Sequence, residues 1–337
     1  MKKDLILAIE TSCDETAVAI LREGHELLSN IVYSQIEVHQ QFGGVVPEVA
    51  SRIHVEKITE VIFEALEVAD VTMEDISAIG VTQGPGLIGA LHVGLQAAKA
   101  LAWYYEIPLI GVHHIAGHIY ANELVEPLSY PLVALVVSGG HSELVLMKEE
   151  NQFEVIAQTG DDAIGEAYDK VARVMDAGYP GGPVIDKMAK LGKPHYELAK
   201  VKPHQPDQFS FSGLKSSVIQ AIAREEKKGL SINKEDMAFA FQERALDQIL
   251  EKTKEVIEDI SPKHVVIAGG VAANSRLRER IQELLSHYPE IKLTIPPMKY
   301  CTDNAAMIAV AASISWKYNK PSDLSISAQS VLDLAVF

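Results

Sequence analysis

The sequence predicts a duplicated α/β fold with two lobes and a cleft between them. A strand, a short polar turn and a second strand occur twice along the chain. Each of these hairpins is followed, after helical stretches, by an apolar strand that enters a glycine-bearing loop and then a helix. A length of 337 residues also exceeds that of a typical single domain, so two separate cores are expected.

The two repeats match element by element. In pairs, the matching segments are the hairpins 5–20 and 132–147, the strand and glycine loop 79–89 and 265–274, the helices 90–103 and 275–285, and the strands 108–112 and 291–295. A polar cluster that opens another helix follows each of the last two strands. This order is typical of actin-like (ASKHA) nucleotide-binding proteins, in which backbone N–H groups gather at helix starts.

The repeats also predict where the lobes divide. The first lobe is expected to comprise residues 1–129 and 305–337, because the final helix, at about 304–318, carries small and apolar residues at core-facing spacing. The second lobe is expected to comprise residues 130–304, with a helical insertion at about 163–258.

Composition restricts the classes of function. Hydrophobic residues make up 47% of the chain, but no apolar run approaches the roughly 20 residues that span a bilayer, so no membrane association is expected. Two cysteines, Cys13 and Cys301, favour a reducing compartment, and we expect the cytoplasm. A net charge of −16 argues against gripping nucleic acid by overall charge, so such a role needs a local patch or a partner.

A pair of histidines predicts a metal site. His114 and His118 are four residues apart, so on a helix both imidazoles leave from one face and can chelate one cation. Asp303, at the matching position of the second repeat, is expected to supply an anionic ligand from the other lobe, so that the metal joins the two lobes. The role of His113 stays open. Ligands of this kind suit iron or zinc better than magnesium.

The histidine spacing also occurs in metalloproteases. That chemistry needs a glutamate directly after the first histidine to act as the general base. Ile115 occupies this position, which argues against a protease.

Two further groups of residues are candidates for ligand chemistry. Asp14 and Glu15 lie in the predicted turn of the first hairpin, where a carboxylate can take part in catalysis or serve simple turn chemistry. Glycines at 139–140 and 269–270 allow backbone amides to approach phosphate or acyl oxygens. Asp169 and Asp186 are candidates for binding ribose hydroxyls, with a solvated helix face as the alternative.

Several motifs together resemble one family. They are residues 10–16 (Glu-Thr-Ser-Cys-Asp-Glu-Thr), 85–87, 114–118, 137–141 (Val-Ser-Gly-Gly-His), Asp169, 181–182 and 301–304 (Cys-Thr-Asp-Asn). Across essentially the whole chain the sequence resembles the TsaD (Gcp/YgjD/Kae) family of tRNA N(6)-adenosine threonylcarbamoyltransferases. The resemblance implies transfer of threonylcarbamoyl from threonylcarbamoyl-AMP to the exocyclic amino group of the adenosine 3′ of the anticodon, in tRNAs reading codons that begin with A. AMP is the leaving product.

The resemblance also implies site residues and partners. His114, His118 and Asp303 match the family's metal ligands, which implies one divalent ion per subunit, Fe(II) with Zn(II) as the alternative. The adenylate-binding positions that match are Val136, Val137, Ser138, Gly139, Gly140, Asp169, Gly182, Asp186 and Asn274. The implied partners are tRNA, a TsaB-type paralogue, a TsaE-type ATPase and a TsaC-type synthase that makes the adenylate.

Two other functional classes fit the same fold. A small-molecule kinase would use similar glycine loops and carboxylates but would bind ATP with magnesium, which leaves a histidine-ligated transition metal unexplained. A non-catalytic nucleotide-binding subunit has no need of three metal ligands, and all three are present here.

Overall fold

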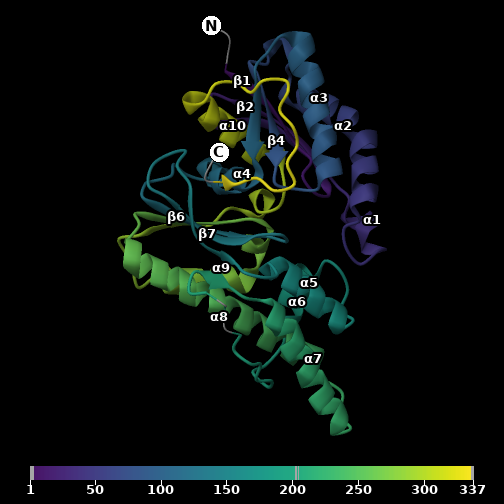
Figure 1. Ribbon diagram of the computed structural model, residues 1–337, viewed down its shortest axis with the longest axis vertical. Helices are drawn as coiled ribbons and strands as arrows, with labels where there is room; N and C mark the ends of the chain where they lie inside the picture. Colours follow the sequence, from purple (N-terminus) through teal and green to yellow (C-terminus); the bar gives the residue numbers. More distant parts are fainter. Residues whose placement is uncertain (1–3, 202, 204, 335–337) are drawn as a thin grey trace. The chain divides into compact units, whose positions relative to one another are not determined.

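The computed structural model describes residues 4–201, 203 and 205–334 and divides the chain into two compact units. Unit 1 comprises Met1–Leu128, Glu149–Phe153 and Pro296–Phe337, and unit 2 comprises Ser129–Lys148 and Glu154–Ile295. Residues 296–304, assigned to the second lobe on the sequence, therefore pack with unit 1. Figure 1 shows the elements of each unit.

Unit 1 is built on a five-stranded sheet in the order β3-β2-β1-β4-β5. β1 runs antiparallel to β2 and parallel to β4, and β4 runs parallel to β5. All six residues of β1 are buried, as expected for a strand that helices cover on both faces. The strands are β1 (Leu5–Glu10), β2 (Glu15–Arg22), β3 (Glu26–Ser34), β4 (Ala78–Gly84) and β5 (Leu109–His113).

Helices lie on both faces of this sheet (Figure 1). α2 (Pro47–Ala69) and α3 (Ile88–Tyr105) pack together on one face, over large side chains such as Leu7. α10 (Ala305–Tyr318) covers the other face, where small residues allow close approach: a Cβ added to Gly80 would lie 2.6 Å from the Cβ of Ala312. The final helix therefore packs on the sheet of unit 1.

The remaining elements of unit 1 are short. They are α1 (Ile36–Gln40), α4 (His114–Tyr120) and the 3-10 turns η1 (Met73–Asp75), η2 (Ala121–Leu124) and η4 (Met298–Tyr300). α4 follows β5 directly and packs against α10. This contact connects the middle of the chain to its final helix and builds the candidate site described below.

Unit 2 repeats the strand arrangement of unit 1. Its sheet has the order β11-β10-β6-β7-β8-β9, so β8-β7-β6-β10-β11 correspond to β3-β2-β1-β4-β5. β6 runs antiparallel to β7 and parallel to β10, as β1 does to β2 and β4. The strands are β6 (Leu132–Val137), β7 (Ser142–Met147), β8 (Glu154–Thr159), β9 (Gln208–Phe209), β10 (His264–Ala268) and β11 (Lys292–Thr294).

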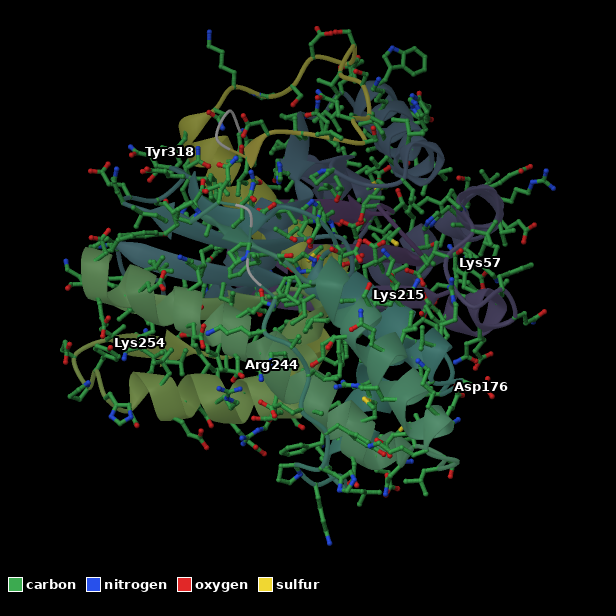
Figure 2. All side chains as sticks on the ribbon, turned by 60° about the horizontal axis from the view of Figure 1, so that its bottom comes forward. Lys57, Asp176, Lys215, Arg244, Lys254 and Tyr318 are labelled. Atoms are coloured by element: carbon green, nitrogen blue, oxygen red, sulfur yellow. The ribbon has the colours of Figure 1, made fainter. Side chains whose placement is uncertain are left out.

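The helices of unit 2 include the predicted insertion, which the structure places between β8 and β10. Its helices are α5 (Ile164–Val174), α6 (Gly181–Ala189), α7 (Ser212–Lys227) and α8 (Lys234–Ile260), and the 3-10 turn η3 (Gly270–Ala273) and α9 (Ser275–Leu285) follow β10. On α8, Arg244 is half-buried and Lys254 is exposed, and Figure 2 labels both residues. They pair with Asp247 at 3.5 Å and with Glu258 at 3.7 Å. Within the described residues, no helix has the length and apolar character needed to cross a membrane.

Candidate functional site

His113 directly precedes α4, the helix that carries the histidine pair. The Nδ1 atom of His113 accepts a hydrogen bond from the backbone N–H of Ile115 at 3.1 Å, and its Nε2 donates to the carbonyl oxygen of Leu332 at 3.1 Å. Burial lowers the pKa of His113 to about 4, so the ring is neutral and the lone pair of Nδ1 accepts this hydrogen bond. His113, whose role the sequence left open, is the N-cap of α4.

Close packing of α4 on α10 brings the third predicted ligand to the histidines. A Cβ added to Gly117 would lie 2.8 Å from Cδ1 of Ile308 on α10, so glycine lets the two helices approach. Asp303 lies in the turn just before α10, next to Asn304, whose Oδ1 caps the helix by accepting from the N–H of Met307 at 3.2 Å. The cap holds the turn, and with it Asp303.

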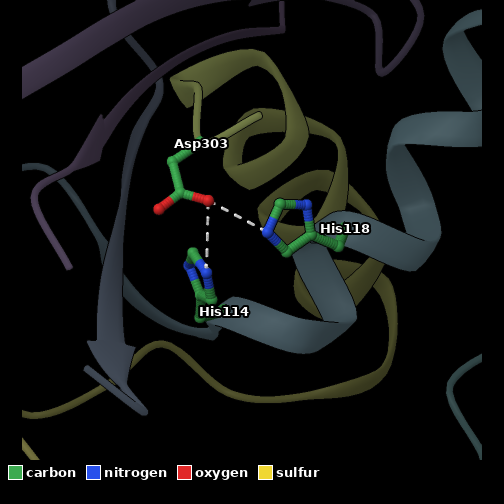
Figure 3. A group of neighbouring side chains, drawn as sticks. All are labelled: His114, His118 and Asp303. Carbon is green, nitrogen blue, oxygen red and sulfur yellow. Dashed lines mark hydrogen bonds and ion pairs between the residues drawn. The ribbon is translucent and has the colours of Figure 1, made fainter. Parts of the chain in front are cut away.

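The three predicted metal ligands meet at one point (Figure 3). Oδ1 of Asp303 lies 3.1 Å from Nε2 of His118 and 3.5 Å from Nε2 of His114. The three ligand atoms lie within 4.8 Å of one another. Both imidazoles are almost fully buried and Asp303 keeps a side-chain exposure of 20%. Two imidazole nitrogens and a carboxylate oxygen form a donor set that can hold a divalent metal ion.

All three of these side chains belong to unit 1. The expectation that Asp303 comes from the second lobe, and that the metal joins the two lobes, is therefore wrong. The physical reason lies in α10, because its small residues pack against the sheet of unit 1 and carry the preceding turn with them.

A second carboxylate contacts His114 at Nδ1, the ring nitrogen that does not face Asp303. Glu10 is fully buried at the end of β1, and its Oε2 lies 3.1 Å from Nδ1 of His114 and accepts from the hydroxyl of Thr82 at 2.6 Å. The hydroxyl of Ser12 also lies 3.1 Å from Nδ1 of His114. A carboxylate on the far nitrogen of a ligand histidine fixes the ring and raises its basicity. The sequence carried one signal for this residue, an acidic side chain closing an apolar strand.

The charges around the histidines favour a cation. Burial alone would lower the pKa of His114, but the carboxylates of Asp303 and Glu10 outweigh burial and raise it to about 9. Burial would raise the pKa of Glu10, but attraction to His114 lowers it below the usual value. With this raised pKa and no metal bound, a protonated His114 would balance the two carboxylates at neutral pH. A bound dication would take over that balance and release the proton.

The predicted catalytic carboxylates lie beside this cluster. Asp14 ends the turn after β1 and is 8% exposed, whereas Glu15 is the first residue of β2 and accepts from the hydroxyl of Ser34 at 3.4 Å. Burial, followed by the negative charges of Asp303 and Asp14, raises the pKa of Glu15 well above its usual value. The turn therefore lies close enough to the candidate metal centre for the two to interact.

In unit 2 the predicted substrate-binding residues gather around a glycine-lined loop. Val136 and Val137 end β6 with buried side chains, and the hydroxyl of Ser138 accepts from the N–H of His141 at 3.0 Å. No atom lies within 4 Å of a Cβ built on Gly139 or Gly140, so the backbone of the loop is open there.

Two other glycines press against the same loop. A Cβ on Gly165 would lie 2.6 Å from the carbonyl oxygen of Ser138, and one on Gly269 would lie 2.5 Å from that of Val137. Gly269 also has a φ of +87°, a conformation that favours glycine. The starts of α5 and η3 thus lie directly against the Ser138 loop.

Asp169 holds the start of α6. Its Oδ1 accepts from the backbone N–H of Gly181 at 2.7 Å, and a Cβ on Gly181 would lie 2.6 Å from the carbonyl oxygen of Tyr168. Gly182, by contrast, has no atom within 4 Å of its Cβ position. Asp169 and Gly182 therefore both lie at the start of α6. Asp169 holds the backbone there, and the space beside Gly182 is open.

Asp186 and Asn274 hold the start of α9. Both carboxylate oxygens of Asp186 lie within 3.0 Å of the hydroxyl of Ser275, which donates to them. Asn274 accepts from the N–H of Leu277 at 2.8 Å and donates to Oε1 of Gln242 at 2.8 Å. The contacts of Asp186 with Ser275 and of Asn274 with Gln242 were not predicted, because only the folded insertion brings α6 and α8 to this position.

The match to a family model covers most of the chain. Residues 26–310 match the model described as "TsaD: tRNA N6-adenosine threonylcarbamoyltransferase". Curated relatives of the same name include one from Bacillus cereus, 53% identical over 335 residues, which cover 99% of this chain and 97% of the relative. Another, from Bacillus licheniformis, is 54% identical over 338 residues, covering 100% and 99%.

Solved structures of low identity share the fold. HypF from T. kodakarensis matches with a TM-score of 0.66 at 14% identity over 94% of this chain and 48% of that chain. An activator of 2-hydroxyisocaproyl-CoA dehydratase from Clostridium difficile, with bound ADPNP, matches with a TM-score of 0.52 at 14% identity over 95% and 99%. The predicted actin-like α/β fold is confirmed. With relatives above 50% identity along nearly its whole length, the chain belongs to the TsaD family of tRNA N6-adenosine threonylcarbamoyltransferases.

Proposed function

We infer that this chain is a transferase that modifies tRNA. It moves the threonylcarbamoyl group of threonylcarbamoyl-AMP to the exocyclic amino group of the adenosine 3′ of the anticodon, in tRNAs that read codons beginning with A, and AMP leaves. The observation that carries this inference is the identity of 53% over 99% of the chain to a relative with this activity in its name. The histidine and aspartate cluster and the open glycine loop supply fitting chemistry.

A divalent metal ion fits the cluster of His114, His118 and Asp303. When bound, the ion supplies a Lewis acid for a phosphate or carboxylate oxygen of the adenylate. We propose Fe(II), with Zn(II) as the alternative, because two imidazoles and one carboxylate suit both ions better than magnesium. The neighbouring Glu10 holds the ring of His114 in place for this role.

The reaction needs a proton acceptor near the amine. The amino nitrogen of the adenosine bonds to the carbamoyl carbon, the bond from that carbon to the phosphate oxygen breaks, and AMP leaves with the bonding electrons. The amine loses one proton, and Asp14 and Glu15 are the carboxylates that we propose to accept it. The proximity of Glu15 to the charge of Asp303 supports this assignment.

Unit 2 is proposed to bind the adenylate. The open backbone at Gly139, Gly140 and Gly182 offers N–H groups to phosphate or acyl oxygens. Asp169, Asp186 and Asn274 hold the helix starts around it, so that these backbones keep one position. Val136, Val137 and Ser138 carry the loop itself.

The proposed partners follow from the family. They are tRNA as substrate, a TsaB-type paralogue, a TsaE-type ATPase and, as the source of the adenylate, a TsaC-type synthase. A net charge of −16 supports the need for a partner in tRNA binding, since phosphate contacts require concentrated lysine and arginine. We place the protein in the cytoplasm, which supplies tRNA and keeps cysteines such as Cys13 and Cys301 reduced.

The decisive experiment is mass spectrometry of tRNA after incubation with threonylcarbamoyl-AMP and the proposed partners. The proposal expects a mass increase on the adenosine 3′ of the anticodon that depends on this chain. A parallel assay of phosphoryl transfer from magnesium ATP to small molecules tests the kinase alternative. Transfer of phosphate without modified tRNA would overturn the proposal.

The turn carboxylates have a separate test. Asp14→Ala and Glu15→Ala are each expected to lower the rate of transfer while the metal content stays at the wild-type level. Unchanged turnover in both variants would remove these residues from the mechanism and leave the transferase assignment standing.

A further inference from the structure

A histidine occupies a core position of α2. The buried residues of this helix form one stripe, Ala50, His54, Ile58, Val61, Ile62, Ala65 and Leu66. His54 is fully buried. An imidazole at an apolar position is unfavourable unless both of its nitrogens find partners, so its contacts explain why it is there.

Both nitrogens of His54 bond to the first hairpin. Nε2 lies 3.0 Å from the carbonyl oxygen of Cys13, and Nδ1 lies 2.7 Å from the hydroxyl of Thr16. A carbonyl only accepts, so Nε2 carries the hydrogen. Burial lowers the pKa of His54 and keeps the ring neutral, so Nδ1 accepts from the hydroxyl of Thr16.

The two partners flank the proposed catalytic carboxylates. Cys13 directly precedes Asp14, and Thr16 directly follows Glu15, so one imidazole holds the chain on both sides of the pair. A third tie comes from the segment after β3, where the N–H of Gln35 donates to the carbonyl oxygen of Asp14 at 3.0 Å. His54 therefore makes two of the hydrogen bonds that hold this turn, in addition to the pairing of Glu15 and Thr16 with β3.

We propose that His54 is a positioning residue, which clasps residues 13 and 16 so that the Asp14 and Glu15 carboxylates stay in their reactive places. The proposal rests on the catalytic role proposed above for these carboxylates. A displacement of about 1 Å at a reacting group can lower a rate by roughly 100-fold, so a loosened turn should slow the reaction without removing any reacting atom. His54 itself remains out of contact with the substrate, in the core of unit 1.

The test compares His54→Leu, which keeps the packing and loses both bonds, with His54→Gln, whose amide can still donate to the carbonyl oxygen of Cys13. The Leu variant should lower kcat roughly 10- to 100-fold with little change in KM for tRNA. It should keep its metal content and show faster hydrogen exchange in the peptide over residues 13–16. The Gln variant should recover part of kcat and of the protection.

The partner hydroxyl provides an independent variant. Thr16→Val should lower kcat in the same direction, Thr16→Ser should restore it, and the double variant Thr16→Val/His54→Leu should be no slower than His54→Leu alone. If His54→Leu fails to fold, the Gln and Thr16 variants carry the test.

The matched control is His264→Gln in unit 2. His264 is also fully buried and bonds through Nδ1 to the N–H of Ser129 at 3.2 Å and through Nε2 to the hydroxyl of Thr294 at 2.7 Å. This variant should lower the melting temperature and leave kcat of the folded enzyme unchanged.

Three results would overturn the clasp: wild-type kcat in folded His54→Leu, an equal loss of kcat in His264→Gln, or unchanged exchange over residues 13–16. Failure of the catalytic assignment looks different. In that case Asp14→Ala and Glu15→Ala keep full turnover, while the exchange measurement still reports on the clasp by itself.

Discussion

The two units use their predicted functional residues in different ways. In unit 1 the polar atoms of His114, His118 and Asp303 face one another within 4.8 Å. The carboxylates of Asp303 and Glu10 raise the pKa of His114. In unit 2 the polar atoms of Asp169, Asp186 and Asn274 hold helix starts. Unit 2 leaves backbone open, at positions such as Gly139 and Gly182.

This difference separates two kinds of site. A metal centre needs side-chain donors that converge, and the repulsion among its carboxylates is relieved by a cation. In a site that binds phosphate or acyl oxygens through backbone N–H groups, the loop must keep one conformation. The side chains of such a site hold the loop in place, and the backbone binds the ligand. Substitutions should therefore act on metal affinity in unit 1 and on stability or ligand binding in unit 2.

The largest effect is expected from losing one of the proposed metal ligands. His118→Ala or Asp303→Ala should weaken metal binding more than about 100-fold, the upper range for a residue that only orients a ligand. Metal titration with a competing chelator measures this. The control is Asp186→Ala in unit 2, which should keep wild-type metal affinity. If Asp186→Ala lost as much metal affinity as the unit 1 variants, the proposed difference between the two units would be contradicted.

The next largest effect concerns a carboxyl of unit 2. Burial raises the pKa of Glu143 to about 7, so the folded unit binds this proton more tightly than the unfolded chain. The contribution of this group to the free energy of unfolding is therefore fully present below about pH 4.5. It falls by up to roughly 3 kcal/mol as the pH rises through about 7. Glu143→Gln should flatten the fall in stability between pH 5 and pH 8, as measured by denaturant unfolding. A variant that follows the wild-type curve would refute this.

A smaller loss is expected behind the metal ligands. Glu10→Gln keeps the shape of the side chain but removes the charge opposite His114, so metal affinity should fall roughly 10- to 100-fold. Thr82→Val is the matched control, because it removes a hydrogen bond to Glu10 and does not touch the ring. Its loss of affinity should be clearly smaller. Equal affinity of Glu10→Gln and wild type would show that Glu10 does not support the centre.

The smallest effect compares two helix caps. Asn274 caps α9 in unit 2 and Asn304 caps α10 in unit 1, and each substitution to alanine should reduce stability by about 1 kcal/mol. Only Asn304→Ala should also weaken metal binding, because Asp303 precedes it. Unfolding and metal titration of the same two proteins measure both quantities. A metal effect of Asn274→Ala would break the comparison.

The repeat and its elements followed from the sequence. The hairpins, the glycine loops and helices such as α9, observed at 275–285 as predicted, depend on local periodicity and turn residues, which a sequence displays directly. β3 and β8 were not predicted, because each is an edge or near-edge strand with half-exposed side chains and no strong apolar pattern. The histidine pair is local as well, since a helix places residues four apart on one face.

Only the tertiary structure decided which residues, distant in the sequence, come into contact with these locally predicted ones. Asp303 joins the histidines within unit 1 because small residues on α10, Gly80 and Gly117 allow close packing that no spacing reveals. The contacts of Glu10 with His114 and of His54 with Cys13 join residues that are remote in the sequence. The N-cap role of His113 also became visible only in the folded chain. The sequence by itself determined the donor types and the family, because these depend on residue identity and local order. The fold determined the geometry, because convergence depends on packing between elements.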